Sequence, residues 1–295
     1  MRKMSPSLRK QQMQYLSLVL PGMIIFTIGL IIPMFLSFYY SLTSWNGMTV
    51  EKPFVGLDNY VKLVSDPYAR SAWWFTLRFT IWNTIIQNVA AIFMAVALDS
   101  GIKGQKLMRT IFFVPCLISA VVVGFVWLKL YGNVLPALFK LMGLKSSLAM
   151  LLGKEETVLM GLLIANNWQW IGYWMLIYLA ALQGIPTELY EAAKIDGANA
   201  FQSFMRIPIP LLSPTTFYLM LIKIIGTFQV FGPVKLMTQG GPGRATMVIV
   251  YEIYREAFQY YKIGYASAQT LVLFVIIMLV TLVQMKLQKK WVYQY

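Results

Sequence analysis

Long apolar runs recur along the chain, separated by shorter polar segments. A helix that crosses the hydrocarbon core of a bilayer needs about 20 predominantly apolar residues. Six segments reach this length, at 15–40, 74–98, 109–130, 158–182, 211–231 and 266–285. The pattern therefore predicts an all-α polytopic membrane protein with six transmembrane helices, in a single transmembrane domain over residues 1–295.

The composition agrees with lipid as the surrounding solvent. Hydrophobic residues make up 58% of the chain and charged residues 12%, and the mean hydropathy is +0.63. A soluble domain carries about a quarter charged residues. The net charge of +14 would suggest nucleic acid in a soluble protein, but the basic residues flank apolar spans and form no continuous stripe. Nucleic-acid binding is therefore not expected.

The basic residues also predict an orientation. They are densest in the N-terminal arm, in the turn after the second span and in the tail after the last span. Lys and Arg concentrate on the cytoplasmic side of membrane proteins. We therefore expect both termini in the cytoplasm and the segment between the fourth and fifth spans on the same side.

Several chemistries are excluded by absent residue types. The chain has one cysteine, Cys116, and no histidine. An intrachain disulfide, a His-containing metal site and a His-based catalytic triad are therefore impossible. We expect no metal and no cofactor bound by this chain.

The segment 186–210 between the fourth and fifth spans predicts two short helices with a sharp bend. Thr187 can cap the first helix, and Gly197 is a natural left-handed terminator. Asn199 with Gln202 three residues later matches a capping box for the second helix. Pro208 and Pro210 then end it and begin the fifth span.

This segment also carries a family resemblance. Glu191, Ala192, Ala193, Asp196 and Gly197, with Ile207 and Pro210 beyond them, resemble the EAA loop of bacterial ATP-binding-cassette (ABC) importer permeases. Two further stretches are similar to the carbohydrate branch of that family, the maltose and glycerol-phosphate type, and specifically to the first of its two paired permeases. They are Phe54–Tyr60, and Thr238-Gln239-Gly240-Gly241-Pro242 with Thr246, Tyr254, Ala257, Phe258 and Gly264-Tyr265-Ala266 after it.

The resemblance implies a fold, a function and partners. The fold is the type I importer permease, with a cytoplasmic coupling helix between spans four and five, in a bacterial cytoplasmic (inner) membrane. The function is translocation of a sugar or oligosaccharide by alternating access, without an ATPase site in this chain. The implied partners are a second permease, two cytoplasmic ATPase subunits that carry ATP and Mg, and an extracellular or periplasmic sugar-binding protein. The ATPase-coupling residues would be Glu191, Ala192, Ala193, Asp196 and Gly197.

A solute path is expected among polar groups in spans four and five, which flank the EAA loop. Lys223 is near the centre of span five, where an isolated ammonium costs about 2.5–3.5 kcal/mol on insertion scales. Thr227 lies one turn further on the same helix face. Span four contributes a helical stripe of four residues: Asn166, Gln169, Trp170 and Tyr173.

Other interpretations remain open from the residues alone. Asn and Gln also hold transmembrane helices together, and this is the role expected for Asn83, Gln87 and Asn88 in span two. Lys223 could hydrogen-bond a neutral sugar or pair with an anionic solute. An ion-coupled secondary transporter would need inverted repeats or intramembrane carboxylates, and no Asp or Glu lies deep in a predicted span. A membrane-embedded enzyme would need a catalytic pair or metal ligands there.

Overall fold

The computed structural model describes residues 6–143 and 151–291. Within these residues the chain is almost entirely helical, and one isolated antiparallel bridge joins Thr43 to Phe54. The residues form two compact units, Met1–Ser65 with Ile253–Val272 and Asp66–Glu252 with Leu273–Tyr295. The first residues of the predicted basic arm, including Arg2 and Lys3, lie outside the described part.

The first unit begins with a nearly continuous apolar helix. α1 (Pro6–Phe26) continues through a π-helical turn (Thr27–Ile31) into α2 (Ile32–Ser41), and α3 (Asp58–Ser65) follows a loop. The stretch Tyr15–Ser41 is long and apolar enough to cross a membrane, and it buries none of its most apolar window within the chain. This matches the predicted span 15–40.

The loop after α2 is fixed by Asn59, a residue of the 54–60 motif. Its side-chain amide donates to the carbonyl oxygens of Ser41 and Thr43, each at 2.8 Å. Gly264, in the first turn of α14 (Ile263–Trp291), lies against the same loop, because a Cβ there would be 1.9 Å from the Thr43 carbonyl oxygen. The motif residues therefore have a local packing role in this unit.

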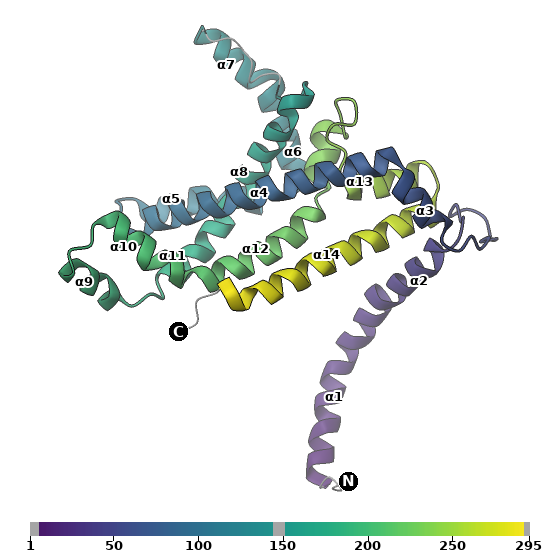
Figure 1. Ribbon diagram of the computed structural model, residues 1–295, viewed down its shortest axis with the longest axis horizontal. Helices are drawn as coiled ribbons and strands as arrows, with labels where there is room; N and C mark the ends of the chain where they lie inside the picture. Colours follow the sequence, from purple (N-terminus) through teal and green to yellow (C-terminus); the bar gives the residue numbers. More distant parts are fainter. Residues whose placement is uncertain (1–5, 144–150, 292–295) are drawn as a thin grey trace. The chain divides into compact units, whose positions relative to one another are not determined.

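The second unit is built on three long helices. α4 (Pro67–Asp99) packs along α8 (Glu155–Leu182) and against α12 (Ser213–Phe228), as Figure 1 shows. Shorter elements complete the unit: α5 (Gln105–Phe113), a 3₁₀ turn (Val114–Leu117), α6 (Ala120–Lys129), a π turn (Leu130–Val134), α7 (Leu135–Leu141), α9 (Thr187–Ile195), α10 (Ala200–Arg206), α11 (Pro208–Leu211), a π turn (Val234–Thr238) and α13 (Ile249–Tyr254). The last residues of α13 and the π turn that follows it (Arg255–Gln259), which precedes α14, belong to the first unit.

Four helical stretches among the described residues are long and apolar enough to cross a membrane: Tyr15–Ser41, Pro67–Asp99, Ala120–Leu141 and Ile263–Gln288. The bent pair Ala200–Leu211 and Ser213–Phe228, at 61°, would add a fifth. α8 has 28 residues and is not among these stretches, and Asn166, Asn167 and Gln169 lie in its middle. Six spans therefore remain a prediction, while the described residues show an almost entirely helical fold with several helices long and apolar enough to cross a membrane.

The predicted third span, 109–130, is wrong as one continuous helix. Pro115 lies in the 3₁₀ turn that ends α5, and Ser119 caps α6 by accepting from the Val122 N–H at 3.4 Å. Proline lacks the N–H that an α-helix needs, and the serine cap begins a new helix. The long apolar helix of this region is instead Ala120–Leu141.

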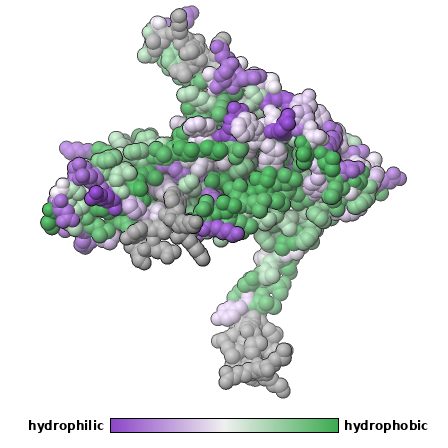
Figure 2. All heavy atoms as spheres, in the orientation of Figure 1, coloured by the Kyte–Doolittle hydropathy of each residue, from purple (hydrophilic) through white to green (hydrophobic). Residues whose placement is uncertain are grey.

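The surface of the second unit divides by polarity along its length. Large apolar side chains are exposed on α4, including Trp74, Ile81 and Phe93. On the face seen in Figure 2, hydrophobic residues cover much of the side of the unit along α4, and hydrophilic residues gather at the end of the unit that holds α9 and α10. An apolar side surface with a polar end is what a bilayer and an aqueous phase would favour.

Candidate functional site

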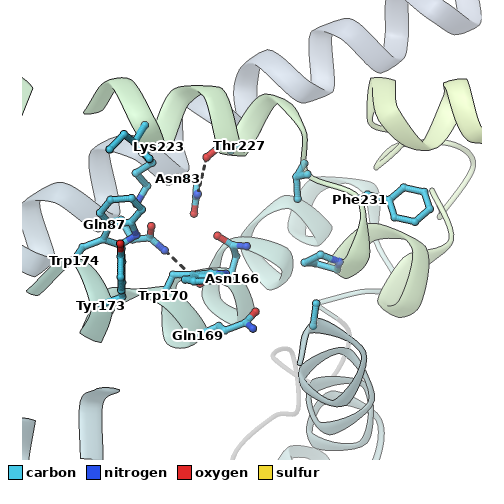
Figure 3. A pocket seen from close by; sticks show the side chains of 15 residues that line it. Asn83, Gln87, Asn166, Gln169, Trp170, Tyr173, Trp174, Lys223, Thr227 and Phe231 are labelled. Carbon is cyan, nitrogen blue, oxygen red and sulfur yellow. Dashed lines mark hydrogen bonds between the residues drawn. The ribbon is translucent and has the colours of Figure 1, made fainter. Parts of the chain in front are cut away.

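One cavity of about 540 Å³ opens between α4, α8 and α12 in the second unit. All six residues predicted for the solute path line it: Asn166, Gln169, Trp170, Tyr173, Lys223 and Thr227. Figure 3 shows them pointing toward a shared space from two helices. The two periodic stripes recognised in the sequence therefore face one another in the fold.

The polar lining is buried and partly organised by hydrogen bonds. Asn83 of α4 donates to the Thr227 hydroxyl at 3.4 Å and accepts from the Asn167 amide at 3.2 Å. Gln87 donates to the Asn166 carbonyl oxygen at 3.3 Å, a bond drawn dashed in Figure 3. These bonds tie α4 to α8 and α12, so Asn83 and Gln87 hold helices together as expected.

Asn83 and Gln87 also line the cavity, which the sequence interpretation did not include. Asn88 does not line it. Its side-chain oxygen accepts from the Tyr178 hydroxyl at 2.8 Å, and its amide donates to the Thr84 carbonyl oxygen at 2.8 Å. Of the three residues expected to hold helices together, only Asn88 is confined to that role.

Lys223 has a distinctive environment. Its side chain is 3% exposed, and its Nζ has no hydrogen-bond or ion-pair partner among the described residues. The ammonium lies 5.0 Å from the centre of the Trp174 ring, within the range of a cation–π interaction. The local surroundings therefore give this cation an aromatic face and no counter-charge.

The aromatic side of the cavity comes from α8. Trp170 and Tyr173 are 38% and 41% exposed, whereas Gln169 is 2% exposed. The Tyr173 ring meets Trp170 and Trp174 edge to face, at centroid distances of 6.3 Å and 5.1 Å. Rings held in this way present flat apolar surfaces beside the polar groups of α4 and α12.

The sequence interpretation missed other lining residues. Trp174 follows Trp170 by four positions, and Gly226 and Val230 follow Lys223 by three and seven, so helical periodicity contained the signal for these three. Ala120, Phe231 and Pro233 also line the cavity. They come from the start of α6 and the turn after α12, and no local pattern places them there.

The segment 186–210 forms the predicted bent pair of helices at one end of this unit (Figure 1). Gly197 has a left-handed backbone with φ +75°. The Ala198 N–H donates to the Ala193 carbonyl oxygen at 2.9 Å, and the Gly197 N–H donates to the Lys194 carbonyl oxygen at 3.1 Å. This is a Schellman termination, which favours glycine. The left-handed terminator is confirmed.

The start of the second helix also follows the prediction, but the start of the first does not. Asn199 and Gln202 form a reciprocal capping box. The Gln202 N–H donates to the Asn199 side-chain oxygen at 2.8 Å, and the Asn199 N–H donates to the Gln202 side-chain oxygen at 3.0 Å. Thr187 is the first helical residue, the N-cap position belongs to Pro186, and no side-chain cap bond forms. The predicted Thr187 cap is therefore wrong, since proline already fixes the turn into α9.

The predicted coupling residues lie on the surface. Glu191, Ala192, Asp196 and Gly197 are exposed, and Ala193 is half-buried. Apolar side chains are exposed beside them, with Ile195 at 87% and Phe201 at 70%. A carboxylate among small and apolar exposed residues is suited to contact with another protein.

The Gly-rich stretch 238–243 forms a hydrogen-bonded turn. The buried Thr246 hydroxyl lies 2.8 Å from that of Thr238 and donates to the Gly241 carbonyl oxygen at 2.7 Å. Arg244 forms an ion pair with the buried Glu252 at 2.8 Å and stacks over Tyr68, 4.4 Å from the ring centre. The Gly-rich stretch is therefore a turn that its motif residues hold in place.

Comparisons with known proteins agree with the motifs. Residues 87–293 match the family described as "Binding-protein-dependent transport system inner membrane component". The chain is 32% identical to the probable starch degradation products transport system permease protein AmyD of Thermoanaerobacterium thermosulfurigenes, over 95% of this chain and 96% of AmyD. It is 33% identical to the multiple sugar-binding transport system permease protein MsmF of Streptococcus mutans, over 88% and 89% of the two chains.

A third relative and a solved structure extend the similarity. The sn-glycerol-3-phosphate transport system permease protein UgpA of Escherichia coli is 31% identical, over 95% of each chain. A chain in the crystal structure of a bacterial alginate ABC transporter, in complex with an alginate pentasaccharide-bound periplasmic protein, matches with a TM-score of 0.84. That match covers 96% of both chains at 23% identity, so it shows a shared fold.

Proposed function

The chain belongs to the family of binding-protein-dependent transport system inner membrane components, and from this premise we propose that it is the permease subunit of an ABC importer for a sugar or oligosaccharide. The observation that carries the proposal is the cavity between α4, α8 and α12. Its buried amides and exposed aromatic faces suit hydroxyl groups and pyranose rings, respectively. AmyD, MsmF and UgpA are named as transport system permeases for starch degradation products, multiple sugars and sn-glycerol 3-phosphate, respectively.

The segment formed by α9 and α10 is proposed to be the coupling element. It joins α8 to α11 and α12, so two of the three helices that line the cavity are connected through it. A force applied to α9 would move these helices together, because hydrogen bonds within each helix make it stiff. Glu191 is proposed for the polar contact with an ATPase subunit, Ala192 and Ala193 for close packing on it, and Asp196 with Gly197 for the bend.

The remaining partners follow from the same proposal. Two cytoplasmic ATPase subunits would bind ATP and Mg, and this chain would hold neither. A second, homologous permease would complete the translocation path, and its contact is proposed to use apolar surface such as that of Tyr15–Ser41. A sugar-binding protein would deliver the solute from outside a bacterial cell membrane, with both termini of this chain and the α9–α10 segment in the cytoplasm.

Reconstitution tests this function directly. The tagged chain is purified with the proteins that accompany it, placed in proteoliposomes, and supplied with the binding protein encoded beside it. We expect saccharide uptake that requires ATP on the side of α9. Uptake that persists without ATP and stops when an ion gradient across the membrane is dissipated would instead identify a secondary transporter.

A further inference from the structure

The cavity lining is unbalanced in hydrogen-bonding capacity. The Lys223 ammonium can donate three hydrogen bonds and makes none with the described residues. The indole N–H of Trp174, which also lines the cavity, is buried and without a partner. Two donors from two different helices are thus available at one place.

The described lining of the cavity offers these donors neutral amide and hydroxyl oxygens but no carboxylate. No Asp or Glu is among the described residues that surround the cavity. The side-chain oxygens of Asn83 and Thr227 already accept hydrogen bonds from Asn167 and Asn83, respectively. A buried cation normally has a counter-ion or faces a functional pathway in a membrane protein. An anionic group on a molecule that enters the cavity would therefore supply the counter-charge that the described lining lacks.

We propose that the transported solute is an anionic saccharide whose carboxylate or phosphate group is bound by Lys223, with Trp174 donating a further hydrogen bond. Trp170 and Tyr173 lie beside this pair and expose their ring faces, so they would contact the sugar ring while Lys223 holds the charge (Figure 3). The proposal rests on the proposed importer function and specifies its substrate class.

The test uses the full complex in proteoliposomes with its binding protein. The vesicles are offered one mixture: acidic oligosaccharides from pectin and alginate, neutral ones from starch and arabinan, and the sugar phosphate glucose 6-phosphate. Imported compounds are identified by mass spectrometry. We expect import of an acidic oligosaccharide or a sugar phosphate, and which of these enters distinguishes carboxylate from phosphate. Import of neutral oligosaccharides alone would overturn the proposal while leaving the importer function intact, and no ATP-dependent import at all would overturn both.

Variants then assign the charge recognition to Lys223. Lys223→Met should lower uptake of the anionic solute at least about tenfold, while Lys223→Arg, which keeps the charge, should stay within about threefold of the unsubstituted chain. The matched control is Lys129→Met, at an exposed lysine of α6 outside the cavity, which should change nothing.

A second substitution keeps the test informative if Lys223→Met fails to assemble. Trp174→Phe keeps an aromatic ring, although a smaller one, and removes the indole N–H donor, and we expect it to reduce anionic uptake severalfold without altering complex yield. Normal uptake of the anionic solute by Lys223→Met would contradict charge recognition by this side chain. If a neutral solute from the mixture is also imported, an equal loss of anionic and neutral uptake in Lys223→Met would contradict it as well.

Discussion

At the scale of single residues, the cavity combines groups of opposite chemical character. Gln169 and Asn83 are almost fully buried, whereas Trp170 and Tyr173 keep more than a third of their surface exposed. The Gln169 amide donates to the Ile118 carbonyl oxygen at 3.0 Å, so its position is fixed by the break between α5 and α6. The exposed rings are therefore the side chains best placed to meet a solute.

Substitution of Tyr173 tests that assignment. Tyr173→Ala should raise the solute concentration for half-maximal uptake by up to about tenfold, because a ring contact contributes about 0.5–1.5 kcal/mol. Tyr173→Phe should remain close to the unsubstituted chain, since it keeps the ring. The control is Tyr218→Ala, at an exposed tyrosine of α12 that does not line the cavity. Equal effects of Tyr173→Ala and Tyr218→Ala would remove Tyr173 from the solute path.

At the scale of elements, the approach of α8 to α5 depends on one glycine. A Cβ at Gly172 would lie 1.8 Å from the Phe112 carbonyl oxygen, a backbone atom that cannot move independently. The next residue on α8 is Tyr173, so the same close approach positions an aromatic residue of the cavity. A side chain at position 172 would push the two helices apart.

Gly172→Ala is therefore expected to destabilise the second unit by about 1–3 kcal/mol, the usual cost of overpacking a tight contact. The measurement is the thermal unfolding midpoint of the purified complex in detergent. Gly132→Ala is the matched control, since a Cβ there meets nothing within 4 Å. A midpoint for Gly172→Ala equal to that of Gly132→Ala would contradict the close packing of α5 on α8.

The bend between α9 and α10 gives a prediction for coupling. Gly197→Pro removes the N–H that donates to Lys194 and cannot adopt φ +75°, so α9 loses its termination. We expect the uptake rate to fall at least about a hundredfold, because misplacing a functional group by about 1 Å can lower a rate by that factor. The amount of chain in the membrane should stay the same.

Ala200→Pro is the matched control for this bend. Position 200 is the first residue of α10, where proline is tolerated, and the preceding Asn199 has an extended backbone with φ −73° and ψ 168°. Its uptake should remain within about twofold of the unsubstituted chain. Normal uptake by Gly197→Pro would show that this bend does not transmit force.

At the scale of the whole molecule, the sequence predicted the membrane class and the local geometry of the site well. The stripes in spans four and five converge because a helix brings positions three, four and seven residues apart onto one face, as with Lys223 and Thr227. The bend at Gly197 and the capping box at Asn199 were readable because their signals are local. The relatives and the family match identify the same class of permease as the EAA motif.

The remainder depended on tertiary packing. Hydropathy alone did not show that the apolar run 109–130 breaks into α5 and α6, because the signals for the break are the proline at 115 and the serine cap at 119. Asn83 and Gln87 were assigned to helix packing alone, because only the fold shows that α4 borders the cavity. The contacts of Phe231 and Pro233 arise from a turn whose direction no sequence period encodes.

The central claim is that α9 contacts a separate ATPase in the cytoplasm, and the single cysteine makes this directly measurable. With Cys116→Ser as the background, Ala192→Cys places a thiol on exposed α9, and Asn46→Cys places one in the loop after α2 as the control. A short bifunctional crosslinker is applied to inverted membrane vesicles that contain the complete complex. We predict that the thiol at position 192, and not that at position 46, crosslinks to the co-purifying ATPase. Labelling of position 192 by an impermeant maleimide from outside intact cells, with no crosslink to the ATPase, would contradict the account.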